Sequence, residues 1–250
     1  MKRLLIRADD LGYSEAVNYG IEKSVRDGLI RSVGMMPNMD AAEHGFELVK
    51  DCDIALGQHS SVCVGKPVCD PELIPSLVGA DGEFRPSSDF RNATEDFVDF
   101  EEAKLEIRAQ LERFREITGR EPDYFEGHAV ASPNLLRAIE AVRVEEGLRS
   151  SYLTFDEPMC FEGTPVRACA MDSMSPGYDA TASLKREVEA APEGSISVYV
   201  CHPGYLDDYI LNHSSLTVNR TKEVATLCDP EMRTWLEAQP GLELIDYRDL

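Results

Sequence analysis

Two adjacent aspartates, Asp9 and Asp10, follow directly on an apolar run near the start of the chain. Residues 4–6 are apolar, and Gly12 interrupts the pattern just after the two carboxylates. This predicts a strand that ends at the aspartates, a tight turn, and a helix capped by Ser14. Neighbouring carboxylates repel each other, so such a pair usually shares a cation or a proton. A solvated aspartate pair in a turn is the alternative.

Three of the five histidines, His59, His128 and His202, follow directly on predicted strands. In a β/α protein the carboxyl ends of the strands meet at one rim, so these side chains could meet Asp9 and Asp10. One Asp and two His are sufficient to hold a divalent metal, with positions left open for water and substrate. A further Asp and His could then act as base and acid. Each histidine alone is typical of a hydrogen-bonded loop residue, and their coincidence at strand ends is what indicates a metal site.

Two further residues carry weaker chemical signals. Cys201 precedes His202, but adjacent residues of a strand point to opposite faces and do not form a nucleophile–base pair. Lys66 lies between Gly65 and Pro67, in a segment without the length of a glycine-rich phosphate loop. Lys66 is therefore either a solvated lysine or a contact for an anionic group of the substrate.

The elements that must position these residues alternate between strand and helix. Besides the first strand, the predicted strands cover residues 32–36, 54–57, 123–126, 148–153, 195–201 and 242–245. After the helix that Ser14 caps, the predicted helices cover residues 41–49 with Asp40 as N-cap, 94–118, 133–147, 182–190, 219–227 and 230–238. Residues 60–93 form a long Pro- and Gly-rich connection, which we expect to close over the site. This order predicts an α/β fold with a mainly parallel sheet, in one domain over residues 1–250.

The composition excludes several kinds of partner. The chain has 250 residues and a formal net charge of -21, which argues against nucleic acid and against an anionic membrane surface. A neutral or cationic small substrate fits this charge better. The seven cysteines have scattered spacings without a Cys-x-x-Cys pair, so we expect reduced thiols and a cytoplasmic protein.

Seven short motifs make the sequence resemble the YdjC or ChbG family of carbohydrate deacetylases. They occur in the family's order and cover nearly the whole chain. The motifs are Ala8-Asp9-Asp10-Leu11-Gly12-Tyr13-Ser14 followed by Val17-Asn18-Tyr19-Gly20-Ile21, then Gly57-Gln58-His59, Gly65-Lys66-Pro67, Asp81-Gly82-Glu83-Phe84, Pro122-Asp123 through Gly127-His128, Cys201-His202-Pro203-Gly204, and Tyr247-Arg248-Asp249.

The resemblance implies a distorted (β/α) barrel of the glycoside hydrolase/deacetylase type. It implies a divalent metal, usually described as magnesium, and hydrolysis of N-acetyl groups on small sugars such as chitooligosaccharides. By position, Asp10, His59 and His128 would be the metal ligands, Asp9 the general base and His202 the general acid. Family members often have several histidines where residues 127–132 of this chain hold His128 alone.

Several alternatives stay open at this point. One Asp and two His suit zinc, cobalt or manganese at least as well as magnesium, which prefers oxygen ligands. A metal-dependent phosphoesterase would call for two metals and more carboxylates. A non-catalytic sugar-binding protein would need neither a base nor an acid. We expect a small N-acetylated sugar as the partner of the site, and a homodimer is a further option.

Overall fold

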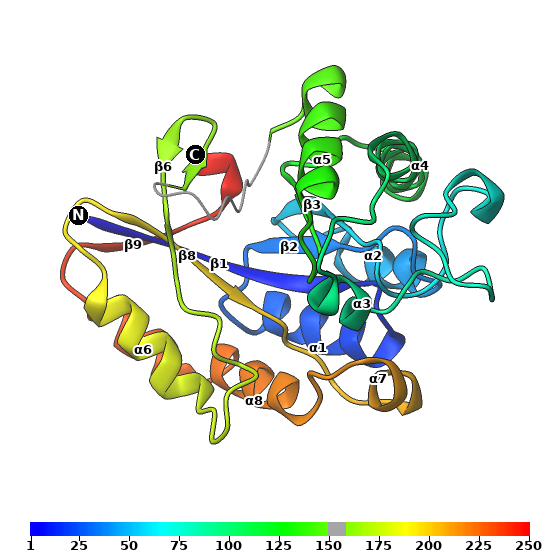
Figure 1. Cartoon of the computed structure of the whole chain (residues 1–250). Coiled ribbons are helices and arrows are strands. Elements are labelled where there is room, and N and C mark those ends of the chain that lie inside the picture. The colour runs from blue at the N-terminus through cyan, green and yellow to red at the C-terminus, as the bar shows by residue number, and fades with distance from the viewer. Residues whose placement is uncertain (150–158) are drawn as a thin grey trace.

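A curled parallel sheet forms the centre of the molecule (Figure 1). The computed structural model describes residues 1–149 and 159–250. In this part of the chain the strand order is β4-β3-β2-β1-β8-β7, and β9 pairs with the start of β1. The strands of the sheet are β1 (Lys2–Leu11), β2 (Ser32–Met35), β3 (Ala55–Ser60), β4 (Phe125–Gly127), β7 (Arg167–Ala168), β8 (Ile196–Cys201) and β9 (Leu242–Ile245). A separate antiparallel pair consists of β5 (Cys160–Phe161) and β6 (Thr164–Pro165).

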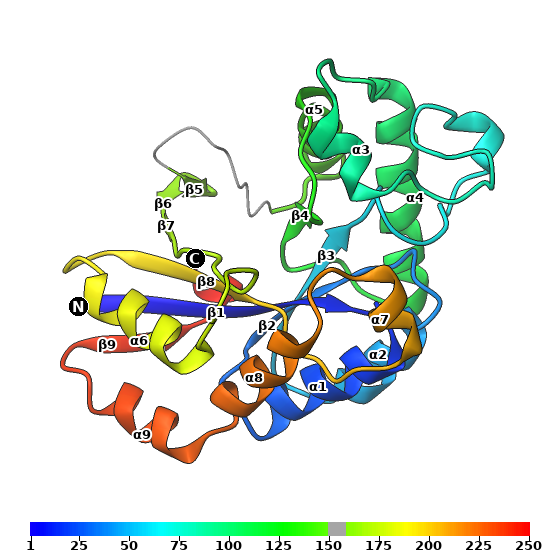
Figure 2. The same cartoon turned by 60° about the horizontal axis from the view of Figure 1, so that its bottom comes forward.

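Helices cover the outside of the curl. In Figure 2, α1, α2, α6 and α8 lie together below the sheet, and α4 and α5 lie beyond its β3–β4 end. No helix in the described ranges combines the length and the apolar character that crossing a membrane requires. The helices are α1 (Glu15–Arg26), α2 (Ala42–Val49), α3 (Ser87–Asn92), α4 (Phe100–Thr118), α5 (Pro133–Glu146), α6 (Ala180–Ala190), α7 (Asp208–His213), α8 (Val218–Leu227) and α9 (Pro230–Glu237).

The alternation along β1 gives the sheet two different faces. Leu4 and Ile6 belong to the core that the sheet shares with the outer helices. Leu5 belongs to a smaller inner cluster with Tyr124 and Tyr247. Side chains two residues apart lie on the same face of a strand, so Leu5 is followed on the inner face by Arg7 and then Asp9. The inner face therefore changes from apolar to charged toward the carboxyl end of β1.

Several predicted boundaries are confirmed. The Ser14 hydroxyl caps α1 by accepting a hydrogen bond from the backbone N–H of Val17, at 3.3 Å. Gly119 ends α4 with φ of +67°, a left-handed conformation that favours glycine. Pro133 is the first residue of α5, where its missing N–H is tolerated.

Other local predictions are wrong. Asp40 does not cap α2, whose N-cap position is Ala41 without a side-chain hydrogen bond. Helix α4 begins six residues later than predicted, because Asp99 accepts hydrogen bonds from the first free N–H groups. His59 lies inside β3 rather than after it, since pairing with β4 extends that strand. The predicted strand over 148–153 lies largely outside the described residues.

The sheet curls without closing into a full barrel. Among the described residues its edge strands β4 and β7 do not pair with each other. A parallel half-barrel with helices outside is the distorted (β/α) barrel that the sequence predicted, so that prediction is confirmed. The carboxyl ends of parallel strands in such a fold gather on one rim, where the segments that follow β1, β2, β3 and β8 face one another.

Candidate metal centre

A bulge at the end of β1 brings both aspartates to one site. The pairing of β1 with β2 shifts register between Ala8 and Leu11, and Asp10 has φ of 77°. This left-handed conformation is uncommon for a residue with a side chain and marks local strain. Successive residues of a regular strand point to opposite faces, and bulges redirect side chains next to functional sites. Here both Asp9 and Asp10 present a carboxylate oxygen near His59.

Three atoms that could bind a metal lie close together at three strand ends, one each from Asp10, His59 and His128. Oδ1 of Asp10 lies 3.4 Å from Nε2 of His59 and 3.1 Å from Nδ1 of His128. The two ring nitrogens are 2.8 Å apart. Asp10 and His59 are buried, and the His128 side chain is 12% exposed. The cluster therefore presents one carboxylate oxygen and two imidazole nitrogens, with only the His128 side open to solvent.

Arg220 of α8 holds the other oxygen of Asp10. Its guanidinium donates to Asp10 Oδ2 at 2.7 Å and to the backbone oxygen of Leu216 at 2.9 Å, and it lies over the ring of Tyr13. Burial alone would raise the pKa of Asp10, but Arg220 and His128 hold that pKa well below its usual value. Asp10 is therefore an anion with one oxygen committed to Arg220 and Oδ1 directed toward the histidines.

Asp10, His59 and His128 form a first layer of the site. A second charged layer, formed by Arg7, Asp9 and Glu126, lies behind it. The Arg7 guanidinium is 2.7 Å from Oδ2 of Asp9 and 3.4 Å from Oε2 of Glu126. Glu126 also contacts Nδ1 of His59 through its other oxygen. Burial lowers the pKa of His59, but the carboxylates of Glu126 and Asp9 raise it well above its usual value overall. Carboxylates that bind the far nitrogen of a metal-binding histidine orient its ring and increase its basicity.

The second layer exists because β2 contributes no side chain to it. Strand β2 lies between β1 and β3, and the residue beside the cluster is Gly34. A Cβ built on Gly34 would lie 2.9 Å from Oδ1 of Asp9, 3.2 Å from Cβ of His59 and 3.5 Å from Oε1 of Glu126. Any side chain here would occupy the space in which the three groups meet. Glycine at this position therefore lets β1, β3 and β4 bring their charged residues together across β2.

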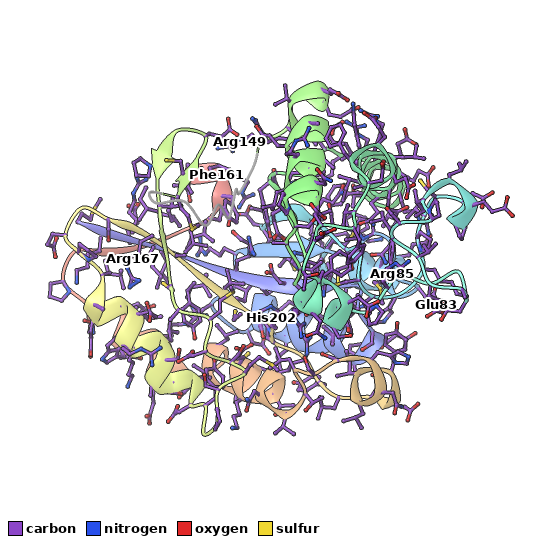
Figure 3. The ribbon with its side chains drawn as sticks, viewed as in Figure 1. Glu83, Arg85, Arg149, Phe161, Arg167 and His202 are labelled. Atoms are coloured by element: carbon purple, nitrogen blue, oxygen red, sulfur yellow. The ribbon has the colours of Figure 1, made fainter. Side chains whose placement is uncertain are left out.

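His202 enters the site from the end of β8. Figure 3 labels it just beyond that strand, in the middle of the view. Its backbone N–H donates to Oε2 of Glu223 at 2.6 Å, and the other oxygen of Glu223 accepts from Tyr178 at 2.9 Å. The Nδ1 of His202 is buried without a hydrogen-bond partner among the described residues. Burial is the main cause that lowers the pKa of His202 to about 4 and raises the pKa of Glu223 to about 7.

A cavity of about 340 Å³ opens onto this cluster. Asp10, His128, His202 and Arg220 line it, together with Arg91 of α3. Serines and two exposed methionines form much of the rest of its wall. They are Ser87, Ser173, Ser214, Ser215, Met171 and Met174. Its size and its mixture of polar and apolar groups suit a small polar organic molecule.

The residues of the first layer fit a divalent metal. Oδ1 of Asp10 is a buried acceptor without a hydrogen-bond partner within the described ranges, and the three donor atoms lie within 3.4 Å of one another. A carboxylate and two imidazoles form a typical donor set for a first-row divalent ion with open positions. The second group of possible ligands, Asp9, His59 and Glu126, already has the Arg7 guanidinium as its cation. We therefore assign one candidate metal position, in the first layer.

The structure brings together most of the residues that the sequence singled out. Asp9, Asp10, His59 and His128 are in one cluster, and His202 lines the same cavity as Asp10 and His128. Asp9 is only 2% exposed and lies behind the residues that line this cavity. Lys66 lines a neighbouring cavity.

Sequence reasoning missed Arg7, Arg220, Glu126 and Glu223. Glu126 had a usable signal, because it precedes His128 by two residues and so shares its face of the chain. Arg220 and Glu223 lie in a helix whose pattern predicted only packing, and nothing local distinguishes them from surface charges. Their partners are 210 and 21 residues away in sequence, respectively.

Two curated relatives match this chain in sequence over nearly its whole length. A Geobacillus stearothermophilus protein named carbohydrate deacetylase is 32% identical, with 98% of this chain and 96% of the relative covered. Carbohydrate deacetylase 2 of Listeria innocua is 29% identical, with 99% and 98% covered.

Solved structures show the same architecture. An Enterococcus faecalis crystal structure named for cellobiose-phosphate cleavage has a TM-score of 0.85 and 25% identity, covering 99% of this chain and 98% of that chain. A structure named T48 deacetylase has a TM-score of 0.51 at 12% identity, covering 98% and 88%, and so shares the fold alone. The model of the family described as YdjC-like protein matches residues 3–238, and the chain belongs to that family.

Proposed function

We propose that this protein is a metal-dependent hydrolase that removes N-acetyl groups from small carbohydrates and releases acetate. The observation that carries the proposal is the Asp10–His59–His128 cluster, which lies in one cavity with His202 and in front of Asp9. The names of the full-length relatives support a carbohydrate deacetylase. Residues 1–250 would act as one deacetylase domain.

Asp10, His59 and His128 would hold the metal. A divalent ion bound there would polarise a carbonyl oxygen and lower the pKa of water from 15.7 to ~7. Glu126 would hold Nδ1 of His59, which leaves Nε2 directed toward Oδ1 of Asp10 as a possible ligand. Arg220 would reduce the negative charge of Asp10 without using its Oδ1. The mixed donor set suits zinc, cobalt or manganese as well as the magnesium that the family resemblance implies.

Asp9 would accept the proton of the attacking water. Arg7 binds one of its oxygens, and Oδ1 has no hydrogen-bond partner among the described residues. His202 would donate a proton to the leaving amine, which is a poor leaving group until it is protonated. Negative charge that develops on the acetyl group during attack raises the pKa of a neighbouring imidazole. His202, which burial keeps neutral at rest, would take up a proton from solvent as this charge develops and then pass that proton to the leaving amine.

A phosphoesterase is the second candidate, because Asp and His clusters at strand ends also bind phosphate esters. A neighbouring structure is named for cellobiose-phosphate cleavage, which makes a phosphorylated sugar a substrate to test. Two-metal phosphoesterases need a second ligand set. In the described part of the chain the other carboxylate–histidine group is Asp9, His59 and Glu126. The Arg7 guanidinium already supplies the positive charge beside it, where a second ion would be needed. The geometry therefore favours the deacetylase.

Acetate release is the test of this function. The panel would contain N-acetylated mono- and disaccharides, each free and phosphorylated, with phosphate release measured in parallel. We expect acetate release that a chelator abolishes and that added metal restores. Phosphate release without acetate release would replace the proposal by the phosphoesterase. Acetate release that no chelator reduces would remove the metal from it.

A further inference from the structure

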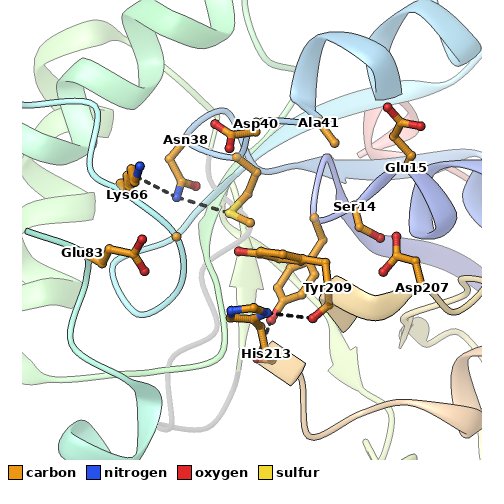
Figure 4. Close-up of a pocket in the computed structure, with 13 residues that line it drawn as sticks. Ser14, Glu15, Asn38, Asp40, Ala41, Lys66, Glu83, Asp207, Tyr209 and His213 are labelled. Atoms are coloured by element: carbon orange, nitrogen blue, oxygen red, sulfur yellow. Dashed lines mark hydrogen bonds between the residues drawn. The ribbon is translucent and has the colours of Figure 1, made fainter. Parts of the chain in front are cut away.

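A second cavity lies next to the metal centre on the same rim. Its volume is about 420 Å³, and Figure 4 shows the residues that line it. They come from the start of α1, the segment after β2, the loop after β3 and helix α7. These segments follow the carboxyl ends of β1, β2, β3 and β8, where ligands bind in folds of this class.

One aromatic ring separates the two cavities. Tyr13 and His213 line both of them. The Tyr13 ring lies 6.2 Å from the ring of His128 on one side and 6.1 Å from the ring of Tyr209 on the other, between centroids. The Tyr13 hydroxyl donates to the backbone oxygen of His213 at 3.0 Å, which fixes this wall. A ligand that passes over Tyr13 would reach from the metal centre into the second cavity.

The second cavity offers a flat aromatic surface and a free acceptor. The rings of Tyr209 and His213 are stacked, 4.2 Å apart and 17° from parallel. Such a surface suits the apolar face of a sugar ring. Asn38 lines the cavity, and its Oδ1 is buried without a hydrogen-bond partner in the described residues. An unpaired buried acceptor favours a ligand that donates a hydrogen bond.

The charge of the walls selects among sugars. Four carboxylates line the cavity, from Glu15, Asp40, Glu83 and Asp207, against the single ammonium group of Lys66. Asp207 caps α7, while no ion pair involves Glu15, Asp40, Glu83 or Lys66 in the ranges that the structure describes. No three of these carboxylates converge as a metal site in those ranges. A cleft of one sign concentrates ligands of the opposite sign, so an anionic group is disfavoured here despite Lys66.

We propose that the second cavity binds a neighbouring sugar unit that carries a free, protonated amine. The inference rests on the proposed deacetylase function and narrows its substrate. The substrate would be a partly deacetylated amino-sugar oligomer, with its remaining N-acetyl group at the metal centre. A reaction that removes an acetyl group or exposes an amine on the neighbouring unit must then come first.

The test compares neighbouring units that differ only at the amine. The probes are the two mono-acetylated chitobioses, N,N′-diacetylchitobiose and its 6-phosphate. We expect kcat/KM for one mono-acetylated form to exceed that for the diacetylated form by roughly tenfold, as a few partly exposed ion pairs provide. The difference should lie in KM and shrink at high salt. The phosphorylated disaccharide should be the poorest substrate.

Variants that remove carboxylates from the second cavity test whether this cavity causes the preference. The double variant Asp40→Asn with Glu83→Gln removes two exposed carboxylates and should reduce the preference to less than about threefold. Glu72→Gln is the matched control, because Glu72 is exposed and lines neither cavity. Equal kcat/KM for both kinds of neighbour, or a preference unchanged in the double variant, would overturn the inference.

Binding provides a measurement that does not depend on turnover. Calorimetry with chitobiose, which has two free amines, should show weaker binding to the double variant than to the wild type and the Glu72→Gln control. If no sugar releases acetate, the proposed function fails, and the calorimetric comparison still decides whether the cavity binds an amino sugar. Equal binding by the three proteins would reject the subsite.

Discussion

Gly34→Ala should damage the site although it replaces none of the charged residues. The added Cβ would lie 2.9 Å from Oδ1 of Asp9, whereas ordinary contact begins near 3.4 Å. Asp9 must therefore move by about 0.5 Å, and Arg7 opposes that movement because it binds the other oxygen at 2.7 Å. The Cβ of His59, at 3.2 Å, offers little room on the other side. The methyl group thus acts on two residues of the site at once.

The expected size of the effect follows from that displacement. A misplacement of 1 Å can reduce catalysis about 10²-fold, so a shift of half that size should lower kcat roughly tenfold. Overpacking a buried site costs about 1–3 kcal/mol of unfolding free energy. The added Cβ presses harder on Asp9 than on His59, the one proposed metal ligand that it contacts, so metal affinity should change less than kcat.

Three measurements on two variants test this reasoning. They are acetate release, metal affinity by titration and unfolding free energy by denaturant. Gly79→Ala is the matched control, because the nearest atoms to its Cβ would be those of the Asp81 carboxylate, at 2.9 and 3.8 Å, and Asp81 is an exposed side chain that can move. If Gly34→Ala matched Gly79→Ala in rate and stability, the idea that Gly34 makes room for the charged layer would be refuted.

Asp9→Asn should retain metal while losing about 10²–10⁴-fold in turnover, the usual contribution of a general base, whereas Asp10→Asn should lose metal. Elemental analysis beside acetate release separates the two, and equal metal loss would mean that both carboxylates bind the ion. Glu126→Gln should weaken metal affinity about 10–100-fold by freeing the His59 ring; an unchanged dissociation constant in a chelator competition would contradict that role. Between pH 4.5 and 7 the native state retains the Glu223 proton that the unfolded chain releases, so this group's contribution to stability falls as pH rises. The wild type should therefore lose stability relative to Glu223→Gln across that range, and denaturant unfolding at several pH values that showed a constant difference would disprove the assignment.

Local patterns in the sequence were sufficient to single out five residues of the candidate site. Apolar runs that end in turn residues indicate strand ends, and parallel strands place those ends on one rim. Asp9, Asp10, His59, His128 and His202 could therefore be expected at one site before any contact was known. Helix ends such as Ser14 and Gly119 were equally local, because a cap depends on a few adjacent residues.

Only the tertiary structure decided which charged partner each aspartate has. Asp9 and Asp10 look alike in the sequence, but the bulge and the left-handed Asp10 give one to Arg7 and the other to Arg220. Those pairings join residues 2 and 210 positions apart, and the second depends on how α8 packs against the sheet.

Space is the other property that sequence patterns do not report. Gly34 matters through the side chain it lacks, and that can be seen only when β1, β3 and β4 are placed around it. The second cavity likewise arises from four segments that meet at the rim, including α7, which periodicity did not predict. Periodicity reports which face of an element is apolar, whereas the volume between elements depends on their packing.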